Sequence, residues 1–180
     1  MSFIINPQDD SSTNGSGVSA PPWLTAGNHV CWAADLNYNQ SKRGDTVIEV
    51  LFCCVQGEQA GARMYERFYL TAGAAWKLSR FARAVGHNES WDASDQERTR
   101  DILTSRPVQC GVSTWVNNKN AERPQLAKGQ IDPYKGEITK QMEELVVALE
   151  DYAEGAKKKS AAPASGGGSY SAVGGSDIPF

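Results

Sequence analysis

The sequence TVIEVLFCCV, from Thr46 to Val55, is almost continuous in apolar, β-branched and aromatic residues. Such a run is typical of a central strand that is buried on both faces. Strand patterns flank it at residues 28–38 and 62–70, and each is separated from it by a polar turn that contains glycine. Three strands joined by short turns therefore form the first half of the expected fold.

The residues after the third strand change to helical periodicity. A helix is expected from Thr71, its cap, to Gly86, its stop, and a capping-box sequence from Ser94 to Glu97 begins a shorter helix that reaches Leu103. A fourth strand is expected at 107–117. After a polar, basic loop at 118–128, a fifth and weaker strand is expected at 129–138, where Pro133 favours an edge position.

A last helix is expected from Thr139 to Gly155, with one apolar stripe along it. The stripe would either pack on the sheet or form a two-fold interface in a homo-oligomer. Residues 1–22 are expected to form a flexible arm, and residues 156–180, rich in Gly, Ser and Ala, a disordered tail.

Five strands with helical residues between the third and fourth are the element order of the OB-fold, a partly open barrel that commonly binds oligonucleotides. We therefore expect a mainly β protein whose folded domain covers residues 23–155 and ends in a helix. A different small α+β sheet is the structural alternative.

Composition excludes several classes of function. The net charge is −3, but five basic residues stand against one acidic residue between Arg63 and Arg83, which predicts a local basic surface. The four cysteines lie in apolar runs without zinc-ligand spacing, which indicates buried free thiols in a reducing compartment. No signal peptide, membrane span, phosphate loop or nucleophile motif is recognisable. We therefore expect a cytoplasmic protein that is not an enzyme and needs no metal or cofactor.

The third strand carries the sharpest candidate site. Side chains alternate across a strand, so Arg63, Tyr65, Arg67 and Tyr69 should share one face. Arginines can contact the phosphates of a single strand, and tyrosine rings can stack on its bases whatever the sequence. This stripe is the expected DNA-binding surface.

Other residues are weaker candidates for the same surface. Trp115 is either a further stacking ring or a core residue; Lys119 and Arg123, in the expected basic loop, and Lys42 and Arg43, in the first hairpin, are candidate phosphate contacts. Trp23 and Trp32 are expected in the core.

The last residues of the chain predict a docking peptide. Asp177, Ile178, Pro179 and Phe180 follow the Gly/Ser-rich stretch and place an aromatic ring beside a carboxylate. Such a tip suits an apolar pocket with a basic rim on another protein.

These residues carry a family resemblance. The Asp-Ile-Pro-Phe end resembles that of bacterial single-stranded DNA-binding proteins, which recruits replication and repair enzymes. The basic-aromatic third strand, the turn Ser41–Asp45 and the helix within 72–86 resemble single-stranded DNA-binding proteins of bacteriophages, over roughly residues 23–138. The resemblance implies an OB-fold that coats single strands during phage DNA replication, recombination or repair in a bacterial host cell.

The expected function is therefore sequence-tolerant binding and protection of single-stranded DNA, with partner enzymes recruited through the tip. The alternative is a protein-interaction adaptor of the replication or recombination machinery that binds little DNA itself. A hydrolase on a small barrel is opposed by the absence of a nucleophile–base pair in the sequence.

Overall fold

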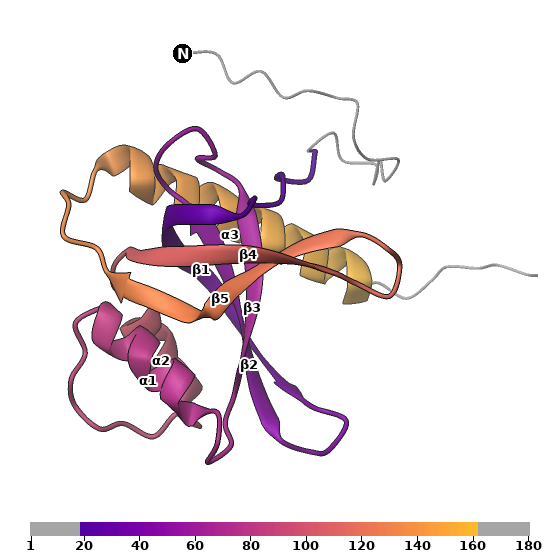
Figure 1. Cartoon of the computed structure of the whole chain (residues 1–180), viewed down its shortest axis with the longest axis vertical. Coiled ribbons are helices and arrows are strands. Elements are labelled where there is room, and N and C mark those ends of the chain that lie inside the picture. The colour runs from indigo at the N-terminus through magenta and orange to yellow at the C-terminus, as the bar shows by residue number, and fades with distance from the viewer. Residues whose placement is uncertain (1–18, 162–180) are drawn as a thin grey trace, which may run out of the picture.

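The computed structural model describes residues 19–161 and shows five strands and three helices in these residues (Figure 1). In chain order they are β1 (Gly27–Gln40), β2 (Thr46–Cys54), β3 (Arg63–Tyr69), α1 (Ala75–Ala84), α2 (Gln96–Leu103), β4 (Val108–Val116), β5 (Glu122–Pro133) and α3 (Lys140–Ala161). The protein is thus mainly β, with a helical insertion between β3 and β4 and a C-terminal helix, as the sequence predicted.

The strands form one antiparallel sheet in the order β3-β2-β1-β4-β5. The long strand β1 is the centre of the sheet: its first residues, up to Cys31, pair with β4, and the stretch from Cys31 onward pairs with β2. This arrangement agrees with an OB-like barrel, but no ladder of backbone hydrogen bonds closes β3 onto β5 within the described residues. The sheet is therefore curled but not closed.

A bulge in β1 changes which face its side chains occupy. The pairing with β2 shifts between Ala33 and Asp35. Trp32, before the shift, and Ala34, within it, point to the outer side of the sheet; after it, Leu36 points into the barrel. A regular alternation would place Val30, Trp32, Ala34 and Leu36 on one face, but Leu36 lies on the other, because one extra residue in a strand reverses all later side chains.

Two cores result, one on each side of the sheet. The larger lies inside the curled sheet, where Phe52, Phe68 and Phe81 meet, and α1 and α2 cover it. The second lies between the outer side of the sheet and α3, whose Met142, Leu149 and Ala153 are buried there. The apolar stripe of the last helix thus packs on the sheet, the first of the two predicted arrangements.

The far end of α3 is fixed by charge. Asp35 on β1 is 5% exposed and accepts hydrogen bonds from Lys157 of α3, at 2.6 Å, and Arg100 of α2, at 2.9 Å. Burial raises the pKa of Asp35, but the two cations more than offset this, so the pKa lies below its usual value of 3.8. The prediction that the helix ends at Gly155 was wrong: a glycine inside a helix costs only about 1 kcal/mol, and the Lys157 ion pair lies beyond it.

Other boundaries also differ from expectation. β5 begins at Glu122 rather than near residue 129, so much of the expected basic loop is strand. α1 begins at Ala75 without a side-chain cap, and Asp95, rather than Ser94, caps α2 by accepting from the Arg98 backbone. These are local differences that leave the order of elements unchanged.

All four cysteines are free and buried, as predicted. Cys31 is paired opposite Cys54 across β1 and β2, and burial raises the pKa of the Cys53 thiol to about 12. Among the described residues, no helix is long and apolar enough to cross a bilayer.

Candidate nucleic-acid interface

The outer face of β3 has the alternation that the sequence predicted. The odd-numbered residues from Arg63 to Tyr69 are partly or largely exposed, whereas the even-numbered residues between them are buried. Across the sheet, Arg67 is paired with Glu49 of β2, and Tyr65 with Leu51. The four predicted residues therefore share one face, but their surroundings differ along the strand.

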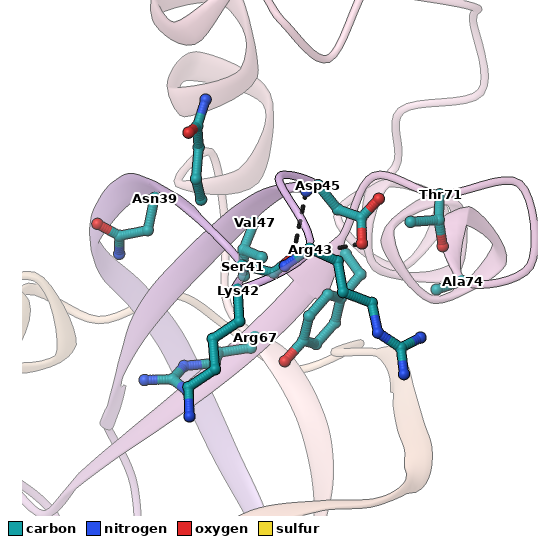
Figure 2. A pocket seen from close by; sticks show the side chains of 11 residues that line it. Asn39, Ser41, Lys42, Arg43, Asp45, Val47, Arg67, Thr71 and Ala74 are labelled. Atoms are coloured by element: carbon teal, nitrogen blue, oxygen red, sulfur yellow. Dashed lines mark hydrogen bonds between the residues drawn. The ribbon is translucent and has the colours of Figure 1, made fainter.

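A pocket of about 840 Å³ lies at the end of this face, between the β1–β2 hairpin and the start of α1 (Figure 2). Its lining includes four of the predicted site residues: Lys42, Arg43, Arg67 and Tyr69. In Figure 2 the side chains of Lys42 and Arg67 extend toward the same side of the pocket. The pocket thus combines an aromatic ring with three basic side chains.

The hairpin at this pocket is held by a small polar network. Ser41 Oγ accepts from the backbone N–H groups of Arg43 and Asp45, and the backbone of Gly44 has φ +86°, where a side chain would be strained. Lys42 and Arg43 are exposed, and neither has an ion-pair partner among residues 19–161. Their charges are therefore available to a ligand.

A second pocket, of about 270 Å³, lies further along β3 and reaches the β4–β5 hairpin. Its lining includes Trp23, Tyr65, Arg67, Trp115 and Arg123. Since Arg67 lines both pockets, they adjoin each other, and we call them together the strand groove. In OB-like folds the face of the second and third strands, between the first and last hairpins, is where oligonucleotides bind.

Trp23 is the residue that sequence reasoning missed. It is only partly buried, forms an isolated β-bridge with Arg63 of β3, and lies close to two guanidinium groups. Its ring centre is 4.3 Å from Cζ of Arg63 and 4.7 Å from Cζ of Arg123. The prediction of a core position was wrong for Trp23 but right for Trp32, whose buried indole donates to the Thr104 carbonyl. The pair of prolines before Trp23 is the one feature of the sequence that could have indicated a position outside the core.

The first half of the β3 stripe is committed to internal contacts. Arg63 lies between Trp23 and Tyr152 of α3 and donates a 3.1 Å hydrogen bond to the Tyr152 hydroxyl. Tyr65 is half-buried against the α3 core, and this burial raises its pKa. These two residues shape the groove, whereas the second half of the stripe is open to a ligand.

Arg67 and Tyr69 form that open half. Arg67 is 65% exposed and its Nε donates to Glu49 at 2.8 Å, which leaves its terminal nitrogens near the pocket surface. Tyr69 is 40% exposed and belongs to neither core. A cation and a ring are thus presented together at the junction of the two pockets.

The β4–β5 hairpin contributes Trp115 and Arg123, which are paired opposite each other on the two strands. Trp115 is 45% exposed, which decides between the two alternatives: it is a surface ring in the groove. Arg123 lies in β5 rather than in a loop, contrary to expectation. Lys119 lies at the exposed turn and lines neither pocket.

A buried carboxylate holds the two sides of the groove together. Glu66 of β3 is 8% exposed, accepts from the Leu126 N–H of β5 at 2.6 Å, and pairs with Lys77 of α1 at 2.5 Å. It joins β3 to β5 where the backbone ladder is missing. This side chain therefore helps to fix the distance between the β3 stripe and the β4–β5 hairpin.

The two histidines lie outside the strand groove. His29 Nε2 is 3.0 Å from the Thr25 carbonyl, and His87 packs edge-on against Trp91. No group of three or more His, Cys, Asp or Glu in residues 19–161 is arranged to hold a metal ion. The predicted tip, Asp177 to Phe180, lies outside the described residues.

The strand groove can thus offer stacking surfaces and cations in sequence: Lys42 and Arg43 at one end, Arg67 and Tyr69 in the middle, Trp115 and Arg123 at the other. A comparison of the sequence with models of known protein families found no match, and neither did a comparison with curated proteins.

Proposed function

We propose that the protein binds single-stranded DNA in the strand groove, coating and protecting it without dependence on sequence. The observation that carries this proposal is the pair of exposed rings in the strand groove, Tyr69 and Trp115, which lie among cations on the side of an OB-like sheet where such folds bind ligands. The protein acts as a binding protein and not as an enzyme.

The chemistry of the groove suits a flexible, charged and aromatic ligand. Each base that stacks on an exposed ring contributes about 1–3 kcal/mol, whichever base it is. Basic side chains at both ends contact successive phosphates and release counter-ions. Since duplex DNA holds its bases inside the stack, only an open strand can use the rings.

The biological setting follows from the resemblance and the C-terminal sequence. The protein coats single strands during phage DNA replication, recombination or repair, in the cytoplasm of a bacterial host. The segment from Asp177 to Phe180 recruits partner enzymes through its aromatic ring and its acidic group.

The direct test is a titration of intrinsic tryptophan fluorescence with a single-stranded oligonucleotide at two salt concentrations. Quenching that is lost with a duplex of the same sequence supports the proposal. The variant Lys42→Ala should reduce the dependence of log affinity on log salt by about 0.7, the value for one phosphate of a single strand.

Lys140→Ala is the matched control, because Lys140 is 87% exposed on α3, where it pairs with Glu144 and lines neither pocket. It should leave the salt dependence unchanged. A parent protein that binds no single strand at low salt would refute the proposal and favour the adaptor function.

A further inference from the structure

An exposed tryptophan outside the strand groove is not explained by the function proposed above. Trp76 is the second residue of α1 and is 53% exposed, more than Tyr69 or Trp115 in the groove. Helix propensity does not favour tryptophan, so it does not explain a large apolar ring on the surface of a helix. The residues around Trp76 indicate that the fold holds this ring in place.

A bulge in β5 supports the ring. The pairing of β5 with β4 breaks between Leu126 and Ile131, and the residues between them face Gly111 alone. In this bulge Lys128 has φ +50° and Gly129 has φ +67°, so two consecutive residues occupy the left-handed region. For a lysine this conformation is unfavourable, and it places an exposed cation next to the residue on which Trp76 lies.

The contact between Trp76 and the bulge is close. A Cβ atom on Gly129 would lie 2.9 Å from Cη2 of Trp76 and 3.2 Å from Cζ3, so a larger residue there would force the ring to move. The far end of the indole therefore lies close against Gly129. Held in this way, a ring that is half exposed can offer a face to a ligand.

The position continues the strand groove. Thr71 and Ala74, which precede α1, line the pocket that contains Tyr69, and Trp76 follows two residues later. Its neighbour Lys77 reaches Glu66 and also approaches Gly129. A strand that leaves the groove beyond Tyr69 would therefore cross the start of α1 toward the β5 bulge.

We infer that Trp76 and Lys128 form an additional contact for a single strand: a base stacks on Trp76 while Lys128 contacts a neighbouring phosphate. This inference rests on the proposed function and specifies how far the bound strand extends. The groove alone would hold a short oligonucleotide, and the Trp76 contact would be used only by a longer one.

The test compares oligonucleotides of about four and about sixteen nucleotides, the range of site sizes for one OB-fold. In full-length protein, Trp76→Leu keeps an apolar cover over Gly129 but removes the stacking ring. We expect a loss of affinity of about 5- to 150-fold for the longer oligonucleotide, the equivalent of one stacked base, and no change for the shorter one. Trp76→Phe should restore part of the loss.

A second variant tests the cation without touching the ring. Lys128→Asn removes the charge with a residue that tolerates the left-handed region, and it should lower the salt dependence by about 0.7 for the longer oligonucleotide only. Affinities of both variants equal to the parent for the longer oligonucleotide would overturn the inference, as would equal losses for both lengths. Failure of the parent to bind either oligonucleotide would instead refute the proposed function.

Discussion

Replacing Glu66 with Gln should loosen the seam between β3 and β5. The substitution keeps the shape of the side chain but removes its charge, and three donors lose a charged acceptor: the Leu126 N–H, the Lys77 ammonium and the Arg67 N–H. Hydrogen bonds to charged groups contribute about 1.5–3 kcal/mol, against about 0.5–1.5 kcal/mol for neutral ones. Because a glutamine side chain has one oxygen and an NH2 group that cannot accept, either the Leu126 N–H or Lys77 loses its acceptor and the other keeps a neutral one, for a combined loss of about 2 kcal/mol.

The Lys77 ammonium adds to this cost. Its side chain is only 20% exposed, so it cannot regain full hydration when its counter-ion is lost. With about 1 kcal/mol for this effect, the free energy of unfolding should fall by about 3 kcal/mol. At about 2–4 °C per kcal/mol for a chain of this size, the melting temperature should fall by about 6–12 °C.

Glu49→Gln is the matched control on the neighbouring strand. Its partner Arg67 is 65% exposed, and an exposed ion pair contributes about 0–1 kcal/mol. Thermal unfolding followed by circular dichroism should therefore separate the two variants clearly. Hydrogen exchange should show faster exchange of the Leu126 amide in the Glu66 variant, because its buried acceptor is weakened.

The same variant connects the seam to binding. If Glu66 sets the distance between Tyr69 and Trp115, its replacement should weaken single-strand binding although it removes no ligand contact. Equal melting temperatures for Glu66→Gln and Glu49→Gln, with unchanged protection of the Leu126 amide, would refute the reasoning about the seam.

Three further predictions follow from the groove, the ion pair and the tip. Tyr69→Ala should weaken single-strand binding by about 1–3 kcal/mol without changing the melting temperature, because the ring belongs to neither core; unchanged affinity in a fluorescence titration would count against the groove. The lowered pKa of Asp35 stabilises the fold above pH 3.8, and this contribution is lost as the pH falls through the still lower pKa of the folded state. The Asp35→Asn variant should therefore lose less stability than the parent on acidification. If urea unfolding showed the same dependence of stability on pH for both proteins, this would be contradicted. Deleting residues 177–180 should leave melting temperature and single-strand affinity at least as high, yet reduce capture of replication or repair proteins from bacterial extract; identical captured sets would oppose the docking role.

The order of elements could be predicted because it depends on local patterns. The apolar run of β2, the alternation in β3 and the apolar stripe of α3 each follow from side-chain period within a few residues. What could not be predicted depends on contacts between distant residues. In the sequence alone, Gly155 indicates the end of the last helix. The helix continues past it, and Lys157 forms an ion pair with Asp35, which is far away in the sequence.

The candidate site divides in the same way. Arg67, Tyr69, Lys42 and Arg43 line one pocket because the first two lie on β3 and the other two in the turn that leads into its neighbour β2. The prediction for Trp23 was wrong because its position depends on Arg63 and Arg123, two residues distant in sequence that the fold brings close to its ring. For this reason Tyr65→Ala, unlike Tyr69→Ala, should disturb packing as well as any ligand contact, since Tyr65 is near Trp23 and the α3 core.

The burial of every cysteine makes the native protein resistant to thiol-modifying reagents. Such reagents need an accessible thiolate, and here each sulfur is enclosed and burial raises the pKa of Cys53. The rate at which a maleimide or disulfide reagent modifies the protein therefore measures how often the interior opens. A single cysteine introduced at an exposed position such as Lys42 would be the one site that reacts quickly, so a dye could be attached there without removing any native residue from the core.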